Sequence, residues 1–539
     1  MTSTRVILGS AIVATLTAAP ALAQDHQHPA GELGSVKFQT SCAAPAQEKF
    51  QHAMALLHSF EFGPAIVDFT AAANADSRCA IAYWGIALAR WTNPFGAGIR
   101  PAAQVQQGLD AIQQARKMDA RTQREKDYID AASKLFTDAA TLDQRARIVA
   151  YEQAMAGVAA KYPDDREAQI FWALSLTASA LPTDKTYANQ LKAGAILEKL
   201  YPLEPDHPGI THYIIHSYDV PALADKAIDA AHRYAKIAPA APHALHMPSH
   251  TFTRVGAWQD SIETNKLSAA AARKLNARAE ELHAMDYMTY AYLQTGQDKA
   301  VQTMISGVPE IAAALDPTKI QGAASGSAGV FALAAMPARW ALERRDWKTA
   351  AALTPSPSQF PHTEAITYFA RALGGTHIGN LEIARESIAA LRQIADKLAA
   401  ANEGYWAEQV RIQHDGAAAF LALAEGRRDD ALKLMTEAAL REDATEKNAV
   451  TPGPIAPARE LLGEMLLQMN RPADALKEFE ATMKKEPNRF RAVYGAAKAA
   501  SLAGDQASAR KYYAELLKIA AKADTPGRPE LAEARQAAR

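Results

Sequence analysis

Apolar and polar positions follow the period of an amphipathic helix along almost the whole chain. From about residue 45 onward, apolar side chains recur every three or four residues, and short polar turns separate the runs. The strict alternation of a half-buried strand does not occur. At 539 residues the chain is too long for one compact hydrophobic core. The pattern therefore predicts an all-α protein built from many short helices.

A regular recurrence organises the C-terminal helices. Small and aromatic residues in one unit return at the same interval as similar residues in the next: Gly463, Leu466, Ala475 and Phe479, then Ala497, Ala500, Ala509 and Tyr513. Small residues let two helices approach closely, and aromatics fill the space between units. The segment from about 456 to 520 resembles the tetratricopeptide repeat (TPR) family, whose unit is a helix–turn–helix of about 34 residues. The resemblance implies a right-handed superhelical array with a concave groove.

The repeat frame divides the chain into regions of unequal regularity. We expect a signal peptide at 1–23, a flexible tail at 24–40 and an N-terminal TPR-like array at 41–300. A middle helical region with irregular repeats is expected at 301–411, C-terminal TPR repeats at 412–523 and a tail at 524–539. Four insertions interrupt the frame: Trp91–Pro101, Leu181–Gln190, Pro317–Gly329 and Asn448–Pro457. Trp91 and Phe95 either cap the groove or simply pack between helices.

The first residues have the composition of a secretory signal peptide. An apolar run from Val6 to Ala21 follows Arg5, and Ala21-Leu22-Ala23 is a small-x-small cleavage sequence. The run is too short for a transmembrane helix, and no later run is long enough to cross a bilayer. We expect a soluble, periplasmic or secreted chain without an integral membrane segment.

The chain has two cysteines, Cys42 and Cys79. An exported protein meets an oxidising compartment, where paired cysteines form disulfides. If 46–59 and 64–75 form a helical hairpin, both cysteines lie at the same end of it. We therefore predict a disulfide that staples the first repeat; two unbonded thiols are the alternative.

The charges are balanced, with 58 Lys and Arg against 59 Asp and Glu. Such a chain has no overall positive field for nucleic acid or anionic membranes. We predict no nucleic-acid partner. Because TPR-like arrays usually act as interaction scaffolds, the resemblance implies a protein or peptide partner.

Histidines concentrate between residues 207 and 250. Seven of the 15 lie there, including the pairs His212/His216 and His246/His250 with the i, i+4 spacing of one helix face. The second pair follows the first at an interval of about 34 residues, which is the TPR period. The repeat frame places these four side chains away from the face that packs the two helices of a unit. In TPR proteins the corresponding positions line the concave groove, so the resemblance implies a histidine cluster there.

Three neighbouring first helices contribute to this predicted cluster. His243 precedes the second pair, and in the next unit the same positions hold His283, Asp286 and Tyr290, although this third unit requires a shift of six residues in the frame. Imidazoles at i, i+4 suit a transition metal. The candidate metal ligands are His212, His216, His243, His246, His250, His283 and Asp286. The candidate ligand-binding residues are Tyr290, Asp219 and Arg254.

A nitrogen-rich shell favours zinc or copper and also accommodates iron or manganese. Asp206 or Asp219 is expected to orient a ligand imidazole from behind. The same histidines could instead bind the carboxylates of a peptide, bind a small ligand, or form a polar cluster around water. Pro248 interrupts one helix: either the helix begins near Met247 or it kinks at the site.

A second metal-binding candidate is the mature N-terminus, Gln24-Asp25-His26, whose amine, amides and imidazole suit Cu(II) or Ni(II). The main hypothesis remains an exported TPR-like binding protein with a histidine site in its groove. The alternatives are a metal-dependent, hydrolase-like enzyme that uses the same histidines and a metal-free interaction scaffold. No sequence motif names a substrate or a catalytic nucleophile, so enzymatic activity is left open.

Overall fold

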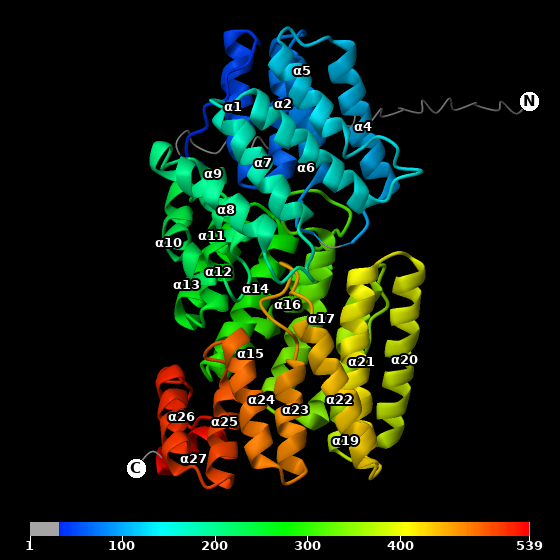
Figure 1. Cartoon of the computed structure of the whole chain (residues 1–539), viewed down its shortest axis with the longest axis vertical. Helices are drawn as coiled ribbons and strands as arrows, with labels where there is room; N and C mark the ends of the chain where they lie inside the picture. The colour runs from blue at the N-terminus through cyan, green and yellow to red at the C-terminus, as the bar shows by residue number, and fades with distance from the viewer. Residues whose placement is uncertain (1–31, 97, 538–539) are drawn as a thin grey trace, which may run out of the picture.

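The computed structural model describes residues 32–96 and 98–537, whose regular elements are all helical (Figure 1). The first half comprises α1 (Ala44–His58), α2 (Phe62–Ala75), α3 (Ala80–Trp91), α4 (Ala102–Lys117), α5 (Gln123–Ser133), α6 (Gln144–Lys161), α7 (Arg166–Ser179), α8 (Ala188–Leu200), α9 (Pro208–Ser217), α10 (Ile228–Ile237), α11 (Pro242–His246), α12 (Pro248–Arg254) and α13 (Trp258–Lys274). Two short 3₁₀ helices, Tyr201–Leu203 and Ala224–Ala227, lie among them.

The second half continues in the same manner. It comprises α14 (Arg278–Gln294), α15 (Asp298–Ser306), α16 (Val308–Ala313), α17 (Gly326–Glu343), α18 (Trp347–Ala352), α19 (Pro361–His377), α20 (Leu381–Ala400), α21 (Gly404–Ala424), α22 (Arg428–Asp443), α23 (Ala458–Gln468), α24 (Pro472–Lys485), α25 (Phe490–Leu502), α26 (Gln506–Ile519) and α27 (Pro529–Ala537).

Helices that follow one another along the chain pack against one another, as α1 and α2, α13 and α14, and α24 and α25 do. In the C-terminal repeats, glycines allow neighbouring helices to pack closely around the ring of Phe479. A Cβ at Gly463 would lie 2.9 Å from the ring of Phe479, and a Cβ at Gly495 would collide with the same ring. The expected all-α array of helix–turn–helix units is therefore confirmed, and the repeat period reflects this packing.

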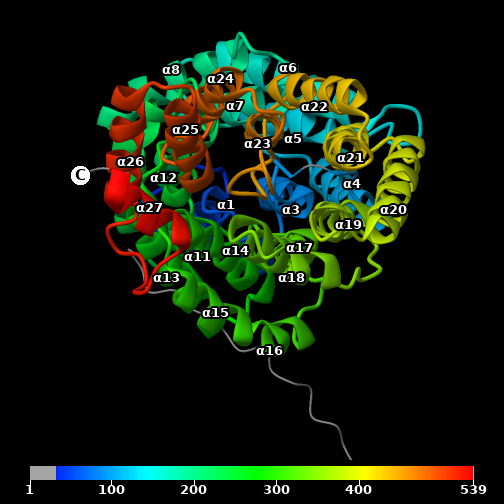
Figure 2. The same cartoon turned by 90° about the horizontal axis from the view of Figure 1, so that it is seen from below.

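The array curves until distant segments meet. The indole nitrogen of Trp258 donates to the carbonyl of Asn488 (2.8 Å), and the backbone N–H of Phe490 donates to Gln294 Oε1 (2.9 Å). These bonds join the start of α13 and the end of α14 to the start of α25. Viewed from below, the helices form a ring in Figure 2. Segments far apart in the sequence thus share one interior.

The four insertions converge on this interior. Asn448 donates to the carbonyl of Phe95 (3.3 Å), and Asn93 donates to the carbonyl of Ala323 (3.3 Å). Lys185 donates to Glu446, just before the last insertion (2.6 Å). The segment between α22 and α23, in orange, lies inside the ring of Figure 2. The insertions thus link parts of the chain that are far apart in the sequence.

Both predicted tails have a packed part. Phe38, in the stretch expected to be flexible, is fully buried against Phe50 because an aromatic side chain gains from leaving water. At the other end, Arg528 forms an ion pair with Asp298 (2.6 Å), and α27 is helical to Ala537. Within the predicted segments 24–40 and 524–539, the described residues thus include a buried aromatic and a packed helix.

The predicted disulfide between Cys42 and Cys79 is present, with Cα atoms 4.9 Å apart. It joins the residues that precede α1 and α3, at the end of the first hairpin. The predicted signal peptide and the metal-binding candidate at Gln24-Asp25-His26 lie outside the described residues. Within 32–96 and 98–537, no helix is long and apolar enough to cross a membrane.

Candidate metal centre

The first histidine pair lies on α9. Pro208 begins this helix at a position where its missing N–H costs nothing. Gly209 follows, and a Cβ there would collide with the imidazole of His58. The glycine therefore lets α9 lie directly against the end of α1. This contact places His212 so that its Nδ1 donates to the backbone carbonyl of His58 (2.6 Å).

The second pair spans a break in the helix. α11 ends at His246, and α12 begins at Pro248, with Met247 joining them in helical conformation. Proline removes one backbone hydrogen bond and bends the axis. The kinked alternative is therefore the correct one. Although His246 and His250 lie on different segments, their Nε2 atoms face each other at 3.1 Å.

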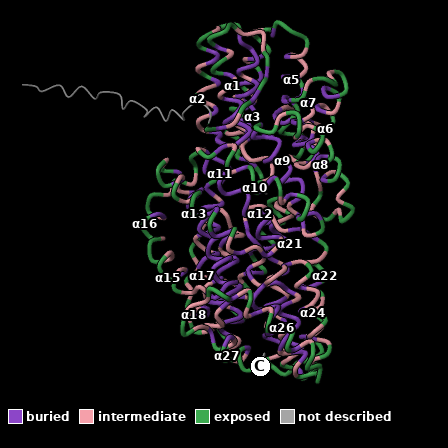
Figure 3. The backbone as a smooth tube through the Cα atoms, turned by 90° about the vertical axis from the view of Figure 1, so that its left-hand side faces the viewer, coloured by how far each residue is buried: buried purple, intermediate pink, exposed green. Residues whose placement is uncertain are grey.

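Six histidines form two adjacent groups of three, each with potential ligand atoms within 4.8 Å of one another. We call them the first triad (His212, His216 and His243) and the second triad (His246, His250 and His283). All six side chains are buried, none more than 7% exposed. Phe95 of the first insertion stacks on His216, and Tyr287 beside the second triad bonds to Ala449 of the last insertion, so the buried histidines do not line an open groove. Figure 3 shows buried backbone, in purple, through the interior around α11 and α12.

The proton positions in the second triad follow from its hydrogen bonds. Asn265 donates its amide to the carbonyl of Ser261 (2.7 Å), so its Oδ1 accepts from His246 Nδ1 (2.6 Å). His250 Nδ1 donates to the Asp219 carboxylate (2.8 Å). A neutral imidazole carries one proton, and each Nδ1 already holds it. Two Nε2 lone pairs therefore point at each other.

The hydroxyl of Tyr287 can donate to only one of these two lone pairs, that of His250. Tyr287 Oη lies 3.3 Å from His250 Nε2 but closer to the carbonyl of Ala449, at 3.0 Å. Its single proton can satisfy one acceptor at a time. His246 Nε2 has no donor in either arrangement. Two imidazole nitrogens bound to one tetrahedral metal ion lie about 3.3 Å apart, close to the observed separation.

The first triad is arranged similarly, but its two facing nitrogens can form a hydrogen bond with each other. His212 Nε2 lies 3.0 Å from His243 Nε2. Since His243 Nδ1 has no partner among the described residues, His243 can carry its proton on Nε2 and donate it to His212. His216 stacks on Phe95 at 4.0 Å between ring centroids, and its Nε2 has no described partner. Phe95 thus covers one side of the first triad.

Burial keeps all six imidazoles neutral. It lowers the pKa of His212 and of His283 to about 3. It holds the pKa values of His216, His243 and His246 well below 6.5, and neighbouring histidines lower them further. For His250, burial outweighs the opposing effect of Asp219 and again lowers the pKa. Neutral imidazoles are the form that binds metals.

Asp219 lies beside the second triad and accepts a hydrogen bond from His250. Besides His250 it accepts from Arg254 (2.8 Å) and lies 3.3 Å from Lys447 Nζ. Burial alone would raise the pKa of Asp219, but Lys447, Arg254 and His250 outweigh it and hold the pKa well below its usual value. Asp219 is therefore a carboxylate that orients His250. Arg254 contacts this carboxylate and no histidine of the triads.

Asp286 and Tyr290 lie elsewhere than the sequence frame predicted. Asp286 accepts from Arg339 (2.9 Å), and Tyr290 Oη lies between Glu486 and Arg489 at 3.3 and 3.2 Å. Neither belongs to a triad. Tyr287 occupies the place expected for Tyr290, because it lies one helical turn after His283 on the same face. The i, i+4 spacing itself would have found it.

A third group lies beside the first triad. Glu167 accepts from His58 Nε2 (3.0 Å) and His207 Nε2 (2.9 Å), and Tyr213 donates to His58 Nδ1 (3.0 Å). These nitrogens are already used in hydrogen bonds. We interpret the group as a buried polar network that fixes His58, whose carbonyl orients His212 in turn. Asp206, the other predicted orienting residue, contacts no triad histidine; its carbonyl accepts from the backbone of Ser35.

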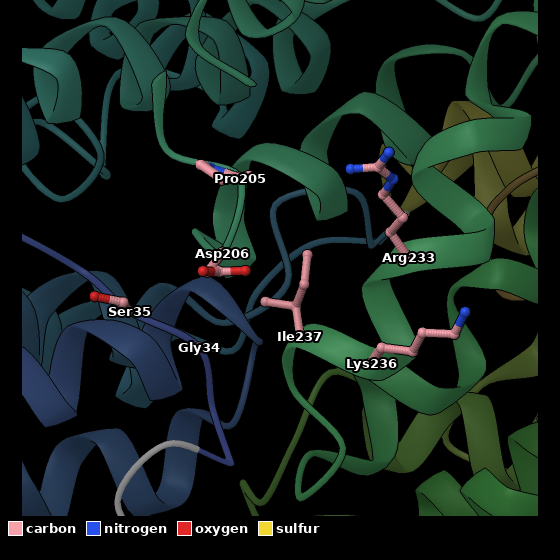
Figure 4. A pocket seen from close by; sticks show the side chains of 7 residues that line it. All are labelled: Gly34, Ser35, Pro205, Asp206, Arg233, Lys236 and Ile237. Atoms are coloured by element: carbon pink, nitrogen blue, oxygen red, sulfur yellow. The ribbon is translucent and has the colours of Figure 1, made fainter. Parts of the chain in front are cut away.

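A surface cavity of about 490 Å³ lies apart from the histidines, between the segment around Gly34 and α10 (Figure 4). Arg233 and Lys236 of α10 border it together with Asp206. The described residues that line it include no triad histidine and no second set of metal-ligating side chains. The enclosed cluster therefore remains the candidate site.

The sequence matches no protein-family model and no curated protein. Among solved structures, the chain is similar to the human IFIT1 dimer with PPP-AAAA, at 12% identity over 82% of this chain and 91% of that chain (TM-score 0.39). The same dimer with m7Gppp-AAAA gives 11% identity over 82% and 90% (TM-score 0.36). The Cut9–Hcn1 hetero-tetramer of APC/C gives 12% over 92% and 90% (TM-score 0.32). Likeness at this level assigns no ligand or partner here.

Proposed function

We propose that this chain is an exported TPR-like protein that binds a transition metal ion, zinc or copper, through its enclosed histidine cluster. The second triad carries the proposal. Its two facing Nε2 lone pairs are unfavourable unless a cation lies between them, and low pKa values make a shared proton an unsuitable cation at neutral pH. The tautomers that create this arrangement are set by Asn265 and Asp219.

The site has the features of a built metal centre. His246 and His250 each donate Nδ1–H to an oxygen, which fixes the ring and raises the basicity of the other nitrogen. His283 supplies the third nitrogen, and all three side chains come from packed helices. Nitrogen ligands without a carboxylate suit zinc or copper better than magnesium or calcium.

The test is the metal content of the purified mature protein. The cells are grown with zinc and copper, and both metals are added to the protein again before analysis. Because the site is buried, supply during folding is needed. We expect at least one ion per chain in the wild type and one ion fewer in His246→Ala plus His250→Ala, which removes two ligands of the second triad. The matched control, His232→Ala plus His377→Ala, should keep its metal. A wild type with substoichiometric metal would refute the proposal.

Asn265 gives a finer test of the same site. Asn265→Leu keeps a similar side-chain size but removes the acceptor for His246 Nδ1–H. We expect metal affinity to fall about 10–100-fold, the usual effect of removing such a supporting group. Asn265→Asp restores an oxygen acceptor and should bind within a few-fold of the wild type. Competition with a chromophoric chelator measures both, and equal affinities for all three proteins would contradict the assignment.

A further inference from the structure

The two triads adjoin each other, although most ring pairs within a triad are closer, at 4.4–5.0 Å between centroids. Ring centroids of His243 and His246 are 6.0 Å apart, and those of His216 and His250 are 5.9 Å apart. Within the first triad, the centroids of His216 and His243 are separated by 6.2 Å. α11 contributes His243 to the first triad and His246 to the second, so one helix joins the two groups. They form one interior cluster with six nitrogen ligands.

We infer that this cluster holds two metal ions, one in each triad, which share a small bridging ligand such as hydroxide. The inference rests on the proposed function and extends it from one ion to a pair. Three histidines leave a position of a four-coordinate ion free, and neighbouring three-nitrogen shells can fill both free positions with one bridge. Paired ions in proteins lie about 3.5–4 Å apart.

Unpartnered nitrogens support the second ion independently. His216 Nε2 in the first triad and His283 Nδ1 in the second are both buried without a hydrogen-bond partner among the described residues. A buried polar atom without a partner is costly. Each triad thus contains a buried imidazole nitrogen that no described protein group satisfies, and a metal in each triad would supply the missing partner. One ion in the second triad would leave the first incomplete.

Charge favours copper for this pair. Neither triad contains a carboxylate, and Asp219 is already compensated by Arg254 and Lys447. Two zinc ions would bring four positive charges into a buried site, whereas two Cu(I) ions bring two. Burying uncompensated charge is expensive. We therefore expect both sites to fill with copper when it is supplied as Cu(I). After oxidation to Cu(II), a bridging hydroxide would offset part of the added positive charge.

The experiment uses His216→Gln and His283→Gln, the substitutions that disturb no described hydrogen bond of these side chains. Copper is added anaerobically as Cu(I) to the full mature chain. We expect two ions per chain in the wild type, one in each variant and none held tightly in the double variant. His232→Gln, at an exposed position, should bind two.

Electron paramagnetic resonance of the oxidised proteins tests the bridge. Bridged Cu(II) ions couple magnetically, so the wild type should show far less signal than its copper content, and each single variant should show one full equivalent. One ion in the wild type, or two ions with a full uncoupled signal, would overturn the inference but leave the proposed function standing. No copper and no zinc would refute both.

Discussion

Stripped of metal, the protein is expected to lose about 1 kcal/mol of its free energy of unfolding per pH unit below about 6.5 for each buried triad histidine that stays neutral in the folded state. Burial lowers the pKa of each imidazole in the folded state, to about 3 for His212 and His283. Unfolded histidines titrate near 6.5. Between these values the unfolded chain binds more protons, so stability is full above pH 6.5 and falls as the pH falls.

Urea unfolding of chelator-treated protein at pH 7.5 and 5.5, followed by circular dichroism, measures this loss. Asp219, whose pKa is lowered, stays charged throughout this window, whereas burial raises the pKa values of Glu280 and Glu442 to about 7. These two groups take up protons in the folded state and offset part of the loss. Metal-loaded protein is the control: bound metal competes with protons, so its loss of stability should begin at lower pH. Equal stability of the metal-free protein at both pH values would contradict the neutral, buried state of the histidines.

Arg339→Met is expected to lower the free energy of unfolding by about 3–5 kcal/mol, the usual cost of breaking a buried ion pair from one side. Arg339 and Asp286 are both fully buried. The guanidinium also donates to Thr451 Oγ1 (2.7 Å) and to the carbonyls of Gly453 and Pro454 (3.1 Å each). The substitution therefore leaves a buried carboxyl group without its partner and releases the insertion that covers the second triad.

The double variant Arg339→Met plus Asp286→Leu separates these effects. Removing both charges should restore most of the stability lost in the single variant, because no unpaired charge remains. Hydrogen exchange at 448–457 should still be faster than in the wild type, since the bonds from Arg339 are gone. A single variant within about 1 kcal/mol of the wild type in urea unfolding would refute this role of the ion pair.

The helical array could be predicted from the sequence because its packing is local. Gly463 and Phe479 touch within one hairpin, and the next unit repeats the same spacing with Ala497 and Tyr513. The packed tail segments could not be predicted in this way. Phe38 packs against Tyr128 of α5, and Arg528 pairs with Asp298 of α15, so both depend on residues distant in the sequence. Short polar segments have no hydrophobic period that would predict such contacts.

The histidines of the site were predictable, but much of their surroundings was not. His212/His216 and His246/His250 show the helix spacing directly, and Asp219 lies close to them in sequence. Asn265 is on the second helix of its hairpin, and Lys447 immediately precedes an insertion in a distant part of the chain. No local pattern links such residues to the site.

The errors at Asp286 and Tyr290 have one cause. The repeat frame reaches the third unit only with a shift of six residues and predicts Asp286 and Tyr290 in the cluster beside His283, whereas α14 presents His283 and Tyr287 there. Asp286 turns toward Arg339 of α17. Contacts with residues distant in the sequence orient Asp286 and Tyr290, and the repeat frame carries no information about such contacts.

X-ray absorption spectroscopy of the copper- or zinc-loaded protein tests the central claim most directly. A metal bound by the triads should show nitrogen neighbours at about 2.0–2.1 Å, together with the outer-shell scattering of imidazole rings. In His246→Ala plus His250→Ala the bound metal per chain should fall, and any metal that remains should have imidazole neighbours from the first triad alone. A first shell of oxygen without imidazole scattering in the wild type would contradict the account.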